Sequence, residues 1–157
     1  MSFPEKVFTK KELKEAKALV NQGFKHELSV EGQSDFTWKV KEALEHVKTA
    51  GYYEYLRTYI RKIVEIDGMT QLRQAEVAIW ANKFAVDNPI DAASLFIQKA
   101  FSMEEYLNSK LYYGGAAEKR SIKKRMEFLQ ALNEKTSDEE VKEECQRLLS
   151  LWRDNSA

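Results

Sequence analysis

The residues that could do acid–base or metal chemistry are few. His26 and His46 are the two histidines of the chain, so a histidine general base or metal site would have to use one of them. His26-Glu27 begins like the zinc-binding helix of a protease, but Val30 stands where that helix needs its second histidine. His46 lies among acidic neighbours on a charged helix face that is poorly arranged for a closed site. The sequence therefore predicts no metal site and no cofactor.

A second chemical candidate is a polar pair inside the apolar stretch 69–86. Glu76 and Asn82 would both be buried if this stretch is a central helix, and a buried carboxylate is costly unless it is paired. Arg73 lies one helical turn before Glu76, which favours a structural ion pair. The alternative is an acid or base lining a pocket, but no second converging group is identifiable. We therefore expect no enzyme, and we expect Trp80→Ala to cost more than about 3 kcal/mol by opening a core cavity.

Aromatic and cationic side chains form two candidate binding clusters. The first combines tyrosine rings with guanidinium groups, which can stack on bases while they hold phosphate. The second follows a pair of glycines and is the best local basic patch in the chain. The candidate binding residues are Tyr52, Tyr55, Arg57 and Arg61 in the first cluster, and Lys119, Arg120, Lys123 and Lys124 in the second. The alternative in both cases is structural, because half-buried tyrosines and solvated charged helix faces are common.

Composition limits the class of protein. The 157 residues include 43% apolar and 32% charged side chains, as in globular domains of ordinary size. Lysine plus arginine equals aspartate plus glutamate at 25 each, so no net field draws the molecule to nucleic acid or to anionic membranes. The single cysteine, Cys145, lies in an apolar helical stripe, and no apolar run is long enough to span a bilayer. These features favour a soluble, cytoplasmic protein.

Helical spacing of apolar residues dominates the chain and predicts an all-α fold. Thr9 and Glu12 form a capping box at the start of the first helix, and Gly51 ends the second. We expect one irregular bundle of six to seven helices around a central buried helix at about 70–86. We expect residues 1–32 to form an N-terminal helix and an extended arm, and residues 33–157 to form the helical bundle of the same domain.

The segment 24–30 is the exception to the helical pattern. Phe24, His26, Leu28 and Val30 alternate with polar residues at the period of a strand. No second strand is visible to pair with it, so we expect an extended arm or an edge offered to another chain.

The functional expectation follows from these limits. We predict a small non-enzymatic module that binds a protein partner through a helix groove or through the 24–30 arm. The alternative is a helical nucleic-acid-binding module that uses the tyrosine–arginine and lysine–arginine clusters. Added salt separates the two, because phosphate contacts weaken steeply with salt and an apolar groove does not.

Overall fold

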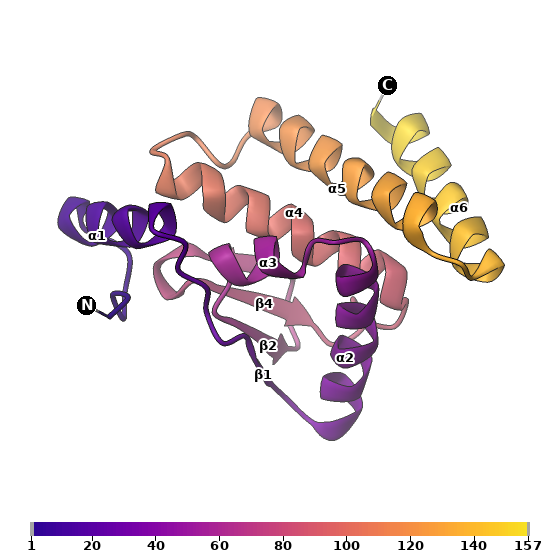
Figure 1. Ribbon diagram of the computed structural model, residues 1–157, viewed down its shortest axis with the longest axis horizontal. Helices are drawn as coiled ribbons and strands as arrows, with labels where there is room; N and C mark the ends of the chain where they lie inside the picture. The colour runs from indigo at the N-terminus through magenta and orange to yellow at the C-terminus, as the bar shows by residue number, and fades with distance from the viewer. Residues whose placement is uncertain (1, 157) are drawn as a thin grey trace.

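The computed structural model describes residues 2–156 and shows an α/β fold (Figure 1). The prediction of an all-α bundle is wrong, because a four-stranded mixed sheet accompanies six helices in these residues. The helices are α1 (Lys10–Asn21), α2 (Ser34–Thr49), α3 (Tyr53–Tyr59), α4 (Pro89–Leu107), α5 (Gly115–Lys135) and α6 (Glu139–Ser156). The strands are β1 (Ser29–Glu31), β2 (Lys62–Ile66), β3 (Gln71–Arg73) and β4 (Ala78–Asn82), with a short 3₁₀ turn, η1 (Gln74–Glu76), between β3 and β4.

The sheet has the order β1-β2-β4-β3 and is mostly parallel. Ile63 of β2 lies between Val30 of β1 and Ile79 of β4, and these three strands run in the same direction. β3 joins β4 in the antiparallel sense at the far edge. Parallel neighbours need a long crossover, and α2 with α3 supplies it between β1 and β2. The 24–30 arm therefore has a partner: its last two residues enter edge strand β1, which pairs with β2.

The stretch 70–86 is not a central helix. It contains β3, η1 and β4, and Val77 at the end of η1 has a left-handed backbone with φ of 57°. β4 is an inner strand with a neighbour on each side, and its first four residues, 78–81, are apolar toward both faces of the sheet. A short apolar run of this kind cannot be told from a buried helical segment by periodicity.

The central helix of the domain is α4. It packs against α1, α2, α3, α5 and α6, and it crosses between the sheet and α5 in Figure 1. Ala93, Phe96, Ile97 and Ala100 are completely buried along it. The side chain of Asn88 caps its first turn by accepting hydrogen bonds from two backbone N–H groups.

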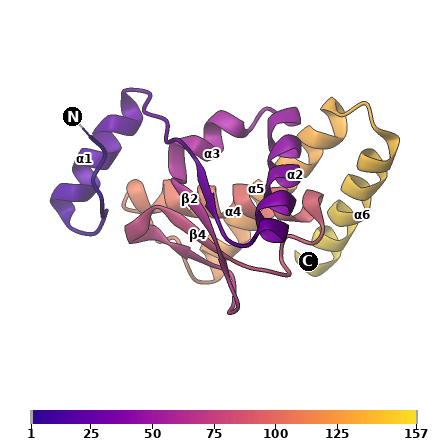
Figure 2. The ribbon, with the colours of Figure 1, turned by 90° about the horizontal axis from the view of Figure 1, so that it is seen from below.

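The two faces of the sheet have different environments. Ile63 and Ile79 are fully buried on the side covered by α2, α3 and α4. The alternate side chains of β2 and β4 point to the opposite face, where Figure 2 shows no helix over the strands among the described residues. We call this opposite face the open face.

Candidate functional site

The open face has an apolar centre built from two neighbouring strands. Val64 and Ile66 of β2 and Trp80 of β4 are partly exposed. Val64 and Trp80 are direct partners in the sheet register. Among the described side chains, the hydrophobic core and the groups packed on it do not include these three. Antiparallel and mixed sheets can leave one face in water, but that face is then usually polar. Three apolar side chains here therefore need an explanation.

Each edge of the open face carries a pair of opposite charges. At the β1 edge, Lys62 Nζ lies 3.5 Å from a carboxylate oxygen of Glu31. At the β3 edge, the Arg73 guanidinium lies 4.1 Å from the centroid of the Trp80 ring, and its Nε is 3.9 Å from Glu76. The four side chains of the two ion pairs are 35–55% exposed, so each pair contributes little to stability. They surround the apolar centre with both signs of charge.

Two large apolar side chains are also exposed in the turns at the carboxyl ends of β2 and β4. Met69 in the turn after β2 is 86% exposed, and Phe84 after β4 is 68% exposed. Asn82 holds these two turns together by donating hydrogen bonds to the carbonyl oxygens of Asp67 and Gly68. The turns are therefore braced while their large apolar side chains remain in solvent. The two turns thus add exposed apolar surface at the end of the sheet where Ile66 is the last residue of β2.

The amino ends of the strands open into a polar hollow of about 380 Å³. It is lined by Glu5, Lys6, Ser29, Arg61, Lys62 and Glu76. Glu76 and Asn82 are half-buried in strand and turn structure, so neither lies in the interior as the helical prediction required. The Glu76 side chain is 35% exposed, and Arg73 is its ion-pair partner as expected. Glu76 shares the lining of the hollow with a second carboxylate, Glu5, and with three cationic side chains.

The predicted tyrosine–arginine cluster is divided between two places. Arg57 donates to the carbonyl oxygen of His26 at 2.8 Å, and Arg61 donates to the carbonyl oxygens of Pro4 and Glu5 at 3.2 and 2.9 Å. The two arginines therefore hold the N-terminal segment against the sheet. The tyrosine ring beside Arg57 is that of Tyr53, at 5.7 Å, and not that of Tyr52 or Tyr55.

The tyrosines of this cluster instead meet the predicted basic patch. Lys124 Nζ lies 5.6 Å from the centroid of the Tyr52 ring and 4.9 Å from that of Tyr55. The Tyr55 hydroxyl donates to Glu104 at 2.7 Å, and burial raises its pKa far above the ordinary value. The rings pack against each other, α4 and α5, so they are not a platform for bases.

Acidic side chains lie among the other residues of the basic patch. Arg120 Nε lies 2.7 Å from a carboxylate oxygen of Glu105, which is 4% exposed. Lys119 and Lys123 are exposed. A shallow hollow of about 240 Å³ beside them includes Glu127. Arg120 and Lys124 of this surface are therefore each paired with an acid.

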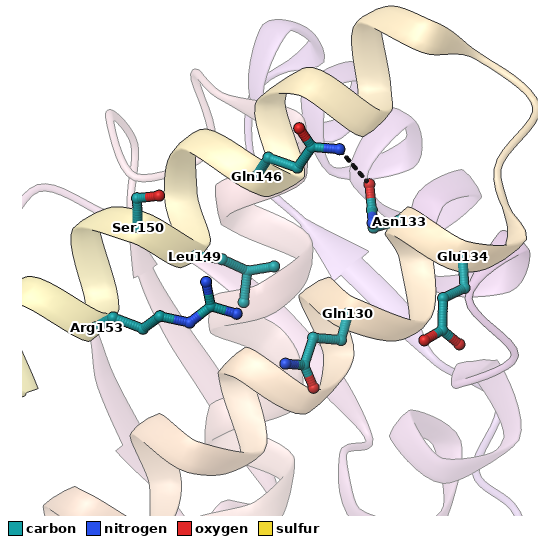
Figure 3. A pocket seen from close by; sticks show the side chains of 7 residues that line it. All are labelled: Gln130, Asn133, Glu134, Gln146, Leu149, Ser150 and Arg153. Atoms are coloured by element: carbon teal, nitrogen blue, oxygen red, sulfur yellow. Dashed lines mark hydrogen bonds between the residues drawn. The ribbon is translucent and has the colours of Figure 1, made fainter.

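A helix groove exists between α5 and α6, and it is polar (Figure 3). Its volume is about 430 Å³, and Gln146 donates to Asn133 across it at 3.4 Å. The lining residues are Gln130, Asn133, Glu134, Gln146, Leu149, Ser150 and Arg153. Leu149 is 4% exposed, so the groove offers almost no apolar surface to an amphipathic helix.

Buried His26 is part of the packing that holds the N-terminal segment. Its ring contacts the rings of Phe3 and Phe24 at centroid distances of 4.4 and 5.0 Å, and its Nε2 has no hydrogen-bond partner among the described residues. Burial, with added repulsion from Arg61 and Arg57, lowers the pKa of His26 from 6.5 to about 4. The imidazole is therefore neutral in the folded protein at neutral pH.

This histidine should make stability depend on pH. The unfolded chain takes up the proton near pH 6.5 and the folded protein only near pH 4. The contribution of His26 to folding stability is therefore fully present above pH 6.5 and is lost as the pH falls from 6.5 toward 4. We expect a loss of about 2 kcal/mol between pH 7 and pH 5, measured by urea unfolding. His26→Phe should flatten most of this slope, whereas His46→Gln should leave most of it. An unchanged slope in His26→Phe would contradict the assignment.

Three classes of site are missing from the described residues. They hold no group of three or more histidine, cysteine, aspartate or glutamate side chains placed to bind a metal ion. None of their helices combines the length and apolar character needed to cross a membrane. Cys145 is buried, which raises the pKa of its thiol to about 11 and suits a core residue better than a nucleophile.

The open face was missed by reasoning from the sequence because it depends on strand pairing. The alternation of Lys62, Val64 and Ile66 with Ile63 becomes meaningful only when β2 is placed between β1 and β4. The continuous apolar character of 77–81 hid the fact that Trp80 points away from the core. No known family model, curated protein or solved structure matches this chain. We therefore infer its function from the geometry of its own structure.

Proposed function

We propose that this protein is a non-enzymatic interaction module that binds a protein partner on the open face of its sheet. The observation that carries the proposal is the position of Val64, Ile66 and Trp80, which lie together outside the core on a face without a covering helix. A partner that covers this face would remove their apolar surface from water, which is the main favourable term in most protein association.

The character of the surface supports a protein as the partner. An apolar centre with a polar, charged rim is the usual anatomy of a protein–protein interface, and aromatic side chains are enriched in such centres. Trp80 provides the aromatic group, and Glu31, Lys62 and Arg73 provide the rim.

The other expected surfaces are less suited to this role. The α5–α6 groove is polar, and the arm is committed to β1 with a short exposed edge. Nucleic-acid binding has less support because Lys124 covers the tyrosine rings and Arg120 pairs with Glu105. The chain also has no excess of positive charge.

A position-specific photo-crosslinking experiment tests the proposal. A benzophenone amino acid is placed at Val64 on the open face or at Glu143, which is exposed on α6. We expect irradiation in cells to give discrete protein adducts at position 64 that survive nuclease and are not seen at position 143. Adducts that are equal at both positions, or that disappear with nuclease, would overturn the proposal.

Variants at the same position make the result quantitative. The purified partner, identified from the adduct, should bind the Val64→Thr protein nearly as well as the unmodified protein. Val64→Lys should weaken binding at least about tenfold, because a charge would have to be buried in the apolar centre. Equal binding by both variants would place the interface elsewhere.

A further inference from the structure

We infer that the partner on the open face is a second copy of this chain, with the two sheets packed face to face about a two-fold axis parallel to the strands. This inference rests on the proposed function and names its partner. Two sheets packed in this aligned way form a sandwich about 10 Å thick, and a two-fold interface must be self-complementary.

The strand order has the symmetry that such an axis needs. In the order β1-β2-β4-β3, an axis between β2 and β4 places β2 over β4 of the second copy and β1 over β3. Val64 and Trp80 are neighbours in one row of the sheet, so each Val64 lies opposite the Trp80 of the other copy. A small side chain then meets a large one twice, which lets the two faces interdigitate.

The charged edges are complementary in the same arrangement. Glu31 and Gln71 are the outer members of the row that contains Val64 and Trp80, so the rotation places Glu31 opposite Gln71 of the second copy. Arg73 projects from the same face as Gln71, one pleat away along β3. Each Glu31 thus comes within reach of the Arg73 guanidinium and the Gln71 amide of the second copy. The arrangement occurs twice in the dimer, once at each edge.

Net charge does not oppose this association. Positive and negative residues balance at 25 each, so two copies approach without long-range repulsion. The same balance makes charge complementarity at the two edges the main electrostatic influence on orientation.

Charge reversal with complementation tests the geometry. Sedimentation equilibrium is measured for the unmodified protein, for Glu31→Arg, for Arg73→Glu, and for an equimolar mixture of the two variants. We expect the unmodified protein to dimerise. Each variant alone should dimerise at least tenfold more weakly, because like charges then meet at both edges. The mixture should form a heterodimer with nearly the original affinity, because both edges again join opposite charges.

Two controls protect this test. Glu27→Arg makes the same change in charge at an exposed position before β1 and should not affect dimerisation. Val64→Lys should prevent dimerisation, and mixing it with either charge variant should not restore a dimer. Thermal unfolding of each protein, followed by circular dichroism, shows whether the variants are folded. If a charge variant proves unfolded, failure of Val64→Lys to reduce dimerisation still overturns the inference.

The outcomes separate this inference from the proposed function. A monomeric unmodified protein at all concentrations, or two variants that dimerise normally and gain nothing on mixing, would overturn the second-copy arrangement. If the protein is monomeric but position 64 still crosslinks to another protein, the proposed function stands and only the identity of the partner changes. A monomer without adducts at position 64 would overturn both.

Discussion

Replacement of Phe96 by alanine is expected to lower the free energy of unfolding by about 3–5 kcal/mol. Phe96 is completely buried near the middle of α4, the helix that every other helix of the described chain packs against. Removing the ring leaves a cavity that the surrounding elements can fill only in part. Urea unfolding followed by circular dichroism measures the loss.

Trp80→Ala is the informative comparison for this prediction. The Trp80 ring lies on the open face and outside the core, where Arg73 covers part of it. The structure therefore lowers the expected cost from more than about 3 kcal/mol to about 1 kcal/mol. If Trp80→Ala were as damaging as Phe96→Ala, the open face would have to be part of the folded interior.

Asp91→Ala is expected to cost about 3 kcal/mol of stability, because it leaves a buried guanidinium without its counter-charge. Arg125 of α5 crosses to α4 with its side chain only 7% exposed, and its Nη2 lies 2.7 Å from Asp91. Its other donors reach Ser94 and Gln98 at 2.8 Å, and the ring of Trp152 stacks against it at 4.5 Å. The charge is thus well satisfied only while Asp91 is present.

A double variant checks this explanation. Arg125→Met fills a similar space without charge, so Asp91→Ala combined with Arg125→Met should be more stable than Asp91→Ala alone. Asp91→Asn keeps an oxygen acceptor and should lie between the unmodified protein and Asp91→Ala. Additive losses in the double variant would show that the ion pair is not the reason for the cost.

Several parts of the fold were predictable because they depend on local interactions. Thr9 and Glu12 form the predicted capping box, since both of its hydrogen bonds join residues three apart. Gly51 has φ of 81° just after α2, as a helix-ending glycine should. Asp138 caps the start of α6 in the same local way, because its carboxylate accepts hydrogen bonds from the backbone N–H groups two and three residues on.

The candidate site was less predictable. The residues Tyr52, Tyr55 and Lys124 were each identified, but the contact of Lys124 on α5 with the two rings at α3 depends on how the helices pack. Arg57 and Arg61 were grouped with the tyrosines by sequence proximity, whereas the structure directs them to the N-terminal segment. Side chains that lie two to four residues apart in the sequence can contact different elements of the structure when their own segment packs against several of them.

The sequence by itself determined the balanced charge of the chain, most of its helices and the burial of Cys145. These properties follow from composition and from hydrogen bonds and apolar spacing within single segments. Only the tertiary structure decided that 70–86 is a strand pair and that the arm belongs to an edge strand, because these strands hydrogen-bond to partners outside their own segments: Ser29 pairs with Lys62, and Lys62 pairs with Ala78. The same long-range pairing decided that Val64 and Trp80 share an open face.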